Sequence, residues 1–238
     1  MRVLALVTGR GNNTMPDKNI KEVLGRPLIY YPTYAALNCP SVNEVYVSSD
    51  DDKILGSMPD LDIKLIKRPV ELSGHDAKHI DVILHAVELF ESEGNKPDIL
   101  IVLLANSVTV KSEWIESCIN EIVNDSSIDS VVPVYQEQDH HPYRAKQLDS
   151  DGLLQPWFDF GDQEVSTNRQ ELPANYFLGH NFWVINMNNG YITGGGQKPW
   201  TFLGNKIKPY IVKECFDVHN EADITRCEHW LTQNNAAV

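Results

Sequence analysis

The first half of the chain alternates short, almost purely apolar runs with longer stretches that carry an apolar stripe at helical spacing. An apolar run without polar alternation is typical of a strand buried on both faces, as in a parallel sheet. We predict strands at 3–8, 43–48, 63–66, 99–104 and 130–135, with 99–104 at the centre. Helices are predicted at 27–38, at 77–91 and from Ser112, which would cap its helix. This alternation indicates an α/β fold with a doubly wound, mostly parallel sheet.

The pattern changes after residue 136. The stretch 136–178 holds short segments, several aromatic residues and many polar ones. We interpret it as a small inserted dimerisation subdomain. Strand character returns at 182–185 and 207–212, and a helix is predicted at 222–231. With 238 residues, the range 1–238 is expected to form one domain that carries this insertion.

Acidic residues outnumber basic ones by 33 to 20, which gives a formal net charge of −13. Such a surface repels phosphate backbones and anionic lipids, so we expect no nucleic-acid partner and no membrane partner. No apolar run is long enough for a signal peptide or a membrane span. The four cysteines are far apart and form no CxxC pair, so we expect free thiols and a cytoplasmic location. An anionic ligand would need the few basic residues gathered where it binds.

A loop rich in glycine and asparagine, 9–19, follows the first predicted strand. Open α/β sheets bind ligands beyond the carboxyl ends of their strands, and glycine lets the backbone turn its N–H groups toward an anion. Arg10 can fork onto phosphate oxygens, and Lys18 adds a second positive charge. Neither the P-loop nor the dinucleotide fingerprint is present. A solvated surface turn therefore stays open as the alternative.

Other candidates lie in the second half of the chain. A short apolar strand is predicted to end at Asp217, and a carboxylate at the end of a strand can hold Mg²⁺ against substrate phosphates. Asn220 is expected to cap the last helix. Arg144 and Arg169 are candidates for recognising a carboxylate, although an isolated arginine is more often simply exposed.

Three histidines, His75, His79 and His85, lie on or near the helix predicted at 77–91. A metal pair is one interpretation of their spacing. We favour a polar face instead, because His85 lies off the face that the other two share. No G-x-S-x-G elbow and no Ser-His-Asp order is present, so acyl hydrolysis has no support.

The order of these motifs resembles that of the acylneuraminate cytidylyltransferase family, the CMP-sialic acid synthetases, over nearly the whole chain. The matching residues are Arg10, Pro16, Lys18, Asn19, Val47-Ser48-Ser49-Asp50, Arg68-Pro69-Val70-Glu71-Leu72, His85-Ala86-Val87-Glu88, Leu103-Leu104, His140-His141-Pro142, Arg169-Gln170-Glu171-Leu172-Pro173 and Asp217. The chain departs from the family at three places. The first loop lacks the Ser-Lys pair, Asn106 stands near the position of a glutamine, and His219 replaces the second aspartate of D-x-D.

The resemblance implies a Rossmann-like nucleotidyltransferase that joins CTP to the 2-hydroxyl of a 3-deoxy-2-keto sugar acid and releases pyrophosphate. It implies Mg²⁺ as the cofactor and a homodimer as the assembly. It assigns catalysis to Arg10, Lys18 and Asp217. It assigns nucleotide binding to Gly9, Arg10, Gly11, Asn12, Asn19, Arg68 and Asn106, and binding of the acidic sugar to His141, Arg144, Arg169 and Gln170. The metal site would comprise Asp217 and His219. His219 would not bind the ion directly, because neutral imidazole is a poor ligand for Mg²⁺.

Three other functions stay open from the sequence. They are a cytidylyltransferase for a phosphorylated acceptor, a nicotinamide-dependent oxidoreductase and a non-catalytic CTP-binding regulator. The missing GxGxxG motif argues against the oxidoreductase. The lost loop lysine and the lost second aspartate keep the regulator open.

Overall fold

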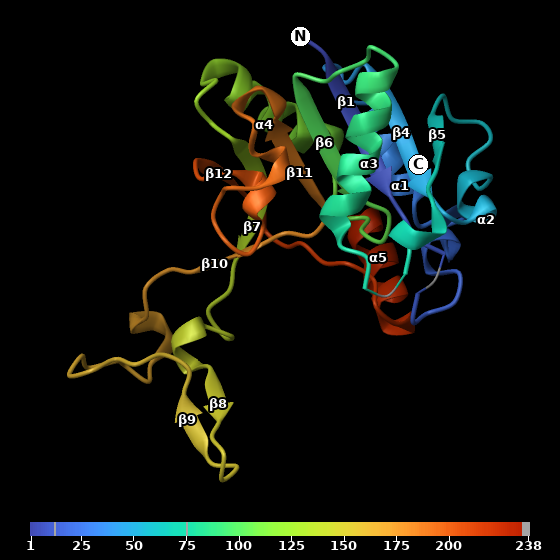
Figure 1. The fold of residues 1–238 in the computed structure, drawn as a ribbon. Coiled ribbons are helices and arrows are strands. Elements are labelled where there is room, and N and C mark those ends of the chain that lie inside the picture. Colours follow the sequence, from blue (N-terminus) through green and yellow to red (C-terminus); the bar gives the residue numbers. More distant parts are fainter. Residues whose placement is uncertain (12, 75, 235–238) are drawn as a thin grey trace.

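The computed structural model describes residues 1–11, 13–74 and 76–234. Its centre is a sheet in which seven strands follow the order β10-β7-β11-β6-β1-β4-β5, and β12 pairs with β7 (Figure 1). The strands are β1 (Val3–Thr8), β4 (Glu44–Ser49), β5 (Lys64–Lys67), β6 (Ile99–Leu104), β7 (Ser130–Gln136), β10 (Tyr176–Leu178), β11 (Phe182–Asn186) and β12 (Ile207–Ile211). The expected mixture of helices with a mostly parallel sheet is confirmed, and β6 lies in the middle.

The strands β1, β4, β5 and β6 form the parallel part of the sheet. Thr8, the last residue of β1, lies in register with Ser48 on one side and with Leu104 on the other. The loops that follow β1, β4 and β6 therefore leave the sheet at the same edge. This is the edge where open α/β sheets bind ligands.

The other part of the sheet is mixed. β11 pairs antiparallel with both β6 and β7, β10 pairs antiparallel with β7, and β12 pairs parallel with β7. An apolar run has the same composition in either direction. Its hydropathy therefore predicts a buried strand without predicting that strand's orientation.

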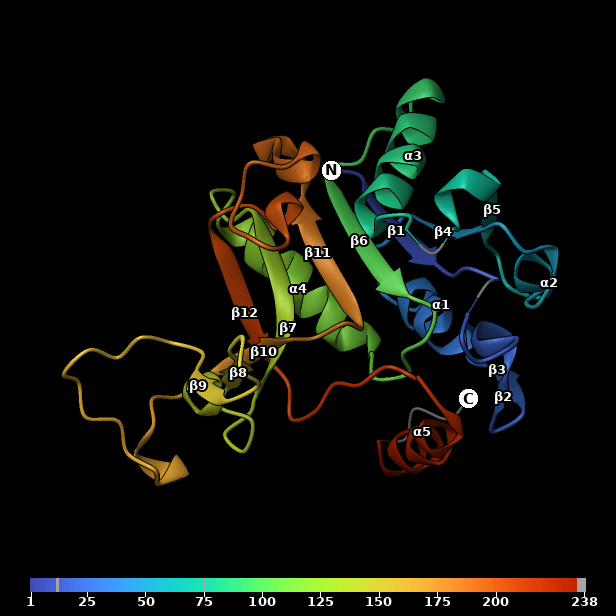
Figure 2. The ribbon, with the colours of Figure 1, turned by 60° about the horizontal axis from the view of Figure 1, so that its bottom comes forward.

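The helices cover both faces of the sheet (Figure 2). They are α1 (Tyr30–Leu37), α2 (Asp52–Leu55), α3 (His79–Ser92), α4 (Ser112–Asn124) and α5 (Glu221–Gln233). Alternate residues of β1 point to opposite layers. Val3, Ala5 and Val7 belong to the core with α1, α4 and α5, whereas Leu4 and Leu6 belong to the core with α3. Burial on both faces is the reason that β1 is apolar throughout.

Three local predictions need correction or refinement. Pro27 lies in the short strand β3 (Arg26–Pro27), which pairs with β2 (Glu22–Val23), so α1 begins three residues after it. Ser112 is the first residue of α4 rather than its cap, because Lys111 holds the cap position. Asn220 does cap α5, through a reciprocal capping box with Asp223.

The inserted segment leaves the sheet after β7 and returns at β10. It carries the hairpin of β8 (Lys146–Leu148) and β9 (Leu154–Pro156), which projects away from the sheet (Figure 1). Leu148, Leu154 and Trp157 are exposed on it. Among the described residues, no helix combines the length and the apolar character needed to cross a membrane.

Candidate active site

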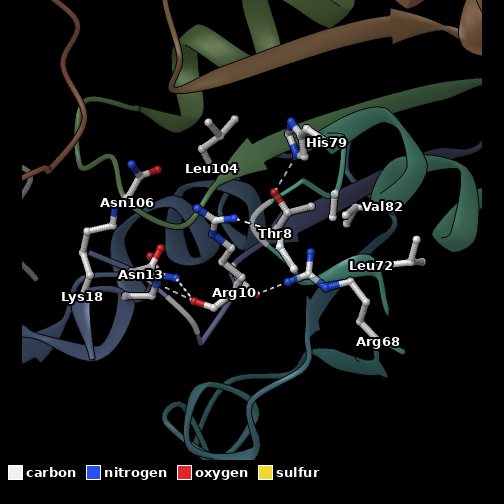
Figure 3. Close-up of a pocket in the computed structure, with 14 residues that line it drawn as sticks. Thr8, Arg10, Asn13, Lys18, Arg68, Leu72, His79, Val82, Leu104 and Asn106 are labelled. Carbon is white, nitrogen blue, oxygen red and sulfur yellow. Dashed lines mark hydrogen bonds between the residues drawn. The ribbon is translucent and has the colours of Figure 1, made fainter. Parts of the chain in front are cut away.

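A pocket of about 300 Å³ opens at the carboxyl ends of β1 and β6 (Figure 3). Thr8 ends β1, Leu104 ends β6, Arg68 follows β5 and His79 begins α3, so four separate elements converge on it. The lining residues are Thr8, Gly9, Arg10, Asn13, Lys18, Asn19, Arg68, Leu72, Gly74, Ala77, His79, Val82, Leu104 and Asn106. Of the predicted nucleotide-binding residues, Gly9, Arg10, Asn19, Arg68 and Asn106 line the pocket, as does Lys18.

The glycine loop after β1 is tied to the neighbouring strand end. Gly9 N–H donates to Ser48 O at 3.1 Å, Gly11 N–H donates to Asp50 Oδ1 at 3.1 Å, and the Arg68 guanidinium donates to Gly9 O at 2.7 Å. A Cβ on Gly11 would lie 2.7 Å from the Asp51 carboxylate, so this close approach requires glycine. Gly11 thus positions the loop without lining the pocket. The predicted contact of Asn12 lies outside the described residues.

Two asparagines hold the backbone of the same loop from inside. Asn13 Nδ2 and Asn19 Nδ2 donate to the carbonyl of Arg10, at 2.6 and 2.9 Å. The guanidinium of Arg10 donates to Gly74 O at 3.3 Å across the pocket. The loop 9–19, predicted to bind phosphate, is therefore held by internal hydrogen bonds and does not form a loose surface turn.

Lys18 is the most deeply buried cation of the loop, with 8% of the residue exposed. Burial lowers the pKa of its ammonium group, the nearby Asp217 carboxylate opposes that shift, and Arg10 adds to it. A desolvated ammonium beside a guanidinium repels it and is stabilised when an anion binds between the two. The pair of Lys18 and Arg10 has the properties of an anion-binding site.

Asp217 reaches this region by a route that sequence reasoning did not predict. The strand predicted to end at Asp217 is wrong, because residues 212–217 form no strand and are held by contacts with the loop after β6. Ser107 Oγ donates to Phe216 O at 2.8 Å, and Val218 N–H donates to Asn106 O at 2.8 Å. These bonds fasten the stretch to the loop that follows β6.

The carboxylate of Asp217 is paired on one oxygen. Asn106 Nδ2 donates to Asp217 Oδ2 at 3.1 Å, and His219 Nε2 lies 3.0 Å from the same oxygen. The structure thus brings the two predicted metal-site residues together. Over the described ranges, however, no three metal-ligating side chains cluster.

His79 is a pocket residue, and the prediction that it belongs to a polar face is wrong for this residue. Its ring packs against buried Trp183 with centroids 5.6 Å apart, and its Nε2 lies 2.9 Å from Thr8 Oγ1. Burial lowers its pKa to about 4, with Arg68 as a further cause. His79 is therefore neutral near pH 7. His85 Nδ1 is buried without a hydrogen-bond partner in the described chain, and His75 lies outside the described residues.

The sequence also did not predict the residues on the apolar side of the pocket. It is formed by Leu72, Ala77, Val82 and Leu104. Such residues carry no chemical signal in a sequence. The only available hint was that Thr8 and Leu104 end adjacent strands at the ligand-binding edge.

The residues predicted to bind the sugar do not line this pocket. They lie on the inserted segment, which projects from the sheet. His141 is 3% exposed, and both its ring nitrogens contact backbone: Nε2 lies 3.0 Å from Pro173 O, and Nδ1 accepts from Tyr143 N–H at 3.1 Å. In this chain, His141 therefore links the start of the inserted segment 136–178 to Pro173 near its end.

The two arginines of the segment are exposed. Arg169 forms an ion pair with the Asp139 carboxylate, and Arg144 donates to Asp139 O at 3.3 Å. Gln170 is exposed beside them. The structure thus gathers the predicted sugar-binding residues on the inserted segment, and none of them lines the pocket of the same chain.

The chain matches the sequence model of the family described as Cytidylyltransferase over residues 5–155. It is 29% identical over 129 residues to pseudaminic acid cytidylyltransferase of Campylobacter jejuni, covering 53% of this chain and 56% of that protein. It is 27% identical over 182 residues to CMP-N,N'-diacetyllegionaminic acid synthase of Legionella pneumophila, covering 72% and 74%. It is 27% identical over 151 residues to N-acylneuraminate cytidylyltransferase A of Danio rerio, covering 63% and 33%. The chain spans about half the length of the first of these relatives.

Two solved structures share the fold. CMP:2-keto-3-deoxy-manno-octonic acid synthetase, complexed with CTP, superposes with a TM-score of 0.70 at 15% identity, over 98% of this chain and 100% of that chain. 4-Diphosphocytidyl-2C-methyl-D-erythritol synthase of Anaerococcus prevotii superposes with a TM-score of 0.61 at 14% identity, over 97% and 96%. At these identities, the likeness concerns the fold.

Proposed function

The chain belongs to the cytidylyltransferase family, and from that premise we propose that it transfers a cytidylyl group from CTP to an acidic 3-deoxy-2-keto sugar. The observation that carries the proposal is the convergence of Arg10, Lys18 and Arg68 on one pocket. The chain as a whole has a net charge of −13. The described residues that line the pocket include these three cations and no carboxylate, a distribution that suits a triphosphate.

In this proposal the hydroxyl oxygen of the sugar attacks the α-phosphorus of CTP. A new oxygen–phosphorus bond forms, the hydroxyl proton passes to solvent, the bond from the α-phosphorus to the bridging oxygen of pyrophosphate breaks, and pyrophosphate leaves. Arg10 and Lys18 hold the triphosphate oxygens, while Asn19 keeps the loop in place through the Arg10 carbonyl. Such a reaction depends on positioning and on charge neutralisation rather than on covalent help from the protein.

We propose Mg²⁺ as the cofactor, held by Asp217. The side chain of Asp217 is 26% exposed, and within the described residues its Oδ1 has no hydrogen-bond partner. One accessible carboxylate oxygen suits an ion whose other ligands are phosphate oxygens and water. When bound, the ion would neutralise part of the phosphate charge. His219 contacts Oδ2 of the same carboxylate, so it would orient Asp217 rather than bind the ion.

The acceptor is proposed to be a nonulosonic acid, and the active form a homodimer. The relatives are named for pseudaminic, N-acylneuraminic and legionaminic acids, all of them acids. Arg144 and Arg169 would bind the acceptor carboxylate of a partner chain, with 136–178 as the dimerisation subdomain. The exposed apolar side chains of Leu148, Leu154 and Trp157 support a contact between this segment and a partner chain. Four free thiols support a cytoplasmic location.

A pyrophosphate-release screen tests the proposal. CTP, Mg²⁺ and the chain are incubated with a panel of 2-keto-3-deoxy sugar acids and, separately, with sugar phosphates. Release with a sugar acid supports the proposal. Release only with a phosphorylated acceptor would favour the runner-up cytidylyltransferase. Tight CTP binding without release from any acceptor would favour a non-catalytic regulator.

A further inference from the structure

Asp50 ends the motif Val47-Ser48-Ser49-Asp50, to which the proposed function gives no role. It follows the last residue of β4, and its side chain is 17% exposed. Burial opposes its ionisation, but a hydrogen bond from Gly11 N–H and the charge of Arg68 hold the pKa of Asp50 below its usual value. Asp50 is therefore an ionised carboxylate in contact with a residue that lines the pocket.

A carboxylate in this place would weaken the binding of a triphosphate by repulsion unless its charge were compensated. The compensating group is Arg68, whose guanidinium forms an ion pair with Asp50 Oδ1 at 3.4 Å and whose side chain is 4% exposed. The same oxygen accepts a hydrogen bond from Gly11 N–H at 3.1 Å. Asp50 Oδ1 thus joins a cation of the pocket to the backbone of the loop 9–19.

The loop is attached to this ion pair on both sides of Arg10. On one side, the Arg68 guanidinium donates to Gly9 O at 2.7 Å (Figure 3). On the other side, Gly11 N–H donates to Asp50. Because Arg10 lies between these two attached residues, the position of its backbone depends on both contacts. The ion pair therefore controls where the Arg10 guanidinium starts from.

Glycine at position 11 makes the attachment possible. A Cβ on Gly11 would lie 2.7 Å from Asp51 Oδ2 and 2.8 Å from Asp51 Cβ. Rotation of the Asp51 side chain cannot relieve the second contact, because Cβ is bonded directly to the backbone. A larger residue at position 11 would therefore push the loop away from the end of β4.

We propose that Asp50 is a positioning residue for the triphosphate, which holds Arg10 in its binding position by accepting from Gly11 N–H and pairing with Arg68. A loop that is already in place loses less conformational freedom when the ligand binds, so the free protein has higher affinity. The assignment rests on the proposed function and identifies the residue that prepares its phosphate site.

Calorimetric titrations of the whole chain with CTP and with tripolyphosphate, both with Mg²⁺ and without acceptor, test the assignment. Tripolyphosphate has no base and no ribose, so it isolates the phosphate part of the site. In Asp50→Ala, both affinities are expected to fall about 10- to 30-fold, the usual effect of losing one or two hydrogen bonds that position a binding group.

A conservative variant separates positioning from a general structural role. The amide oxygen of Asp50→Asn can still accept from Gly11 N–H, so both affinities are expected to stay within about threefold of those of the unmodified chain. Its unfolding temperature should nevertheless fall, because buried Arg68 loses its counter-charge. Asp52→Ala removes an exposed carboxylate that pairs with Lys67. This matched control should bind both ligands as the unmodified chain does.

Gly11→Ala keeps the test decisive if Asp50→Ala does not fold, because it displaces the loop and leaves Arg68 paired. It is expected to weaken the binding of both ligands as Asp50→Ala does. Unchanged tripolyphosphate affinity in Asp50→Ala, or in Gly11→Ala if the first variant does not fold, would overturn the assignment alone. An equal loss of affinity in Asp50→Asn and Asp50→Ala would also overturn it. If the unmodified chain binds neither ligand, the proposed function and the assignment fail together.

Discussion

The side chains of Asn106 and Asp217 are joined by a hydrogen bond of 3.1 Å, although 111 residues separate them in the sequence. A backbone bond of 2.8 Å from Val218 N–H to Asn106 O runs beside it. The loop after β6 and the segment before α5 are thus held together at the edge of the pocket. Asn106, which lines the pocket, therefore holds in place the Asp217 carboxylate that is proposed to bind the metal.

Asp217→Asn is expected to lower the rate of pyrophosphate release about 100- to 1,000-fold at limiting Mg²⁺, because charge stabilisation made in the transition state is lost. A Mg²⁺ titration of the rate measures the effect. Glu221→Gln makes the same change of charge nearby, at an exposed residue that pairs with Lys21. This control should stay within about twofold of the unmodified rate, because exposed ion pairs contribute little. Near-normal turnover of Asp217→Asn would remove Asp217 from the metal site.

Lys18→Met is expected to change stability and ligand binding in opposite directions. The desolvated ammonium destabilises the empty pocket, so its removal should raise the unfolding temperature by a few degrees, ~1 kcal/mol. CTP affinity should fall about 10- to 100-fold with the lost charge-assisted contact. Thermal denaturation without nucleotide and a CTP titration measure the two effects. Lys96→Met, at an exposed lysine, is the matched control. Reduced stability with unchanged CTP affinity would point to a structural role for Lys18.

His79 should make stability depend on pH below neutrality. Its pKa falls from 6.5 to about 4 on folding, so the unfolded chain takes up the proton first. Its stabilising effect is complete above pH 6.5 and is lost as the pH falls from 6.5 towards 4, by up to about 3 kcal/mol. Urea denaturation of the unmodified chain and of His79→Gln, at several pH values, isolates this contribution. Curves that stay parallel from pH 7.5 to 4.5 would contradict it.

Mixing two inactive variants tests the dimer. Arg10→Ala impairs the pocket, and Arg169→Ala impairs the inserted segment 136–178. If each inserted segment completes the partner's pocket, a mixed dimer has one intact site. That site combines the pocket of the Arg169→Ala chain with the inserted segment of the Arg10→Ala chain. An equimolar mixture refolded together should then recover about a quarter of normal activity, because half of the dimers are mixed and each has one working site. A mixture as inactive as its components would place Arg169 outside the partner's site.

The strands that the sequence predicted well are those buried on both faces. β1 has the predicted bounds, 3–8, and β6 the predicted bounds, 99–104. Every side chain of such a strand meets a packed layer, so the requirement for apolar residues acts on the whole run. The direction of β11 carries no comparable signal. An apolar strand buries the same surface whether it runs parallel or antiparallel to β6.

The site divides in a similar way. Arg10, Lys18 and Asn19 could be recognised because glycines, asparagines and basic residues follow a buried strand within one short loop. His79 could not be recognised from its helix. Its environment is created by Thr8, Arg68 and Trp183, which come from three other elements.

The sequence by itself determined the apolar strands, the phosphate-type loop and the family resemblance, because these depend on residues that are neighbours along the chain. The tertiary structure alone decided that Asp217 meets Asn106, that His79 lies neutral in the pocket and that Arg169 does not line it. These relationships depend on contacts between residues far apart in the sequence. Burial and hydrogen bonding across such contacts set the charge and the position of each group, and no local pattern records them.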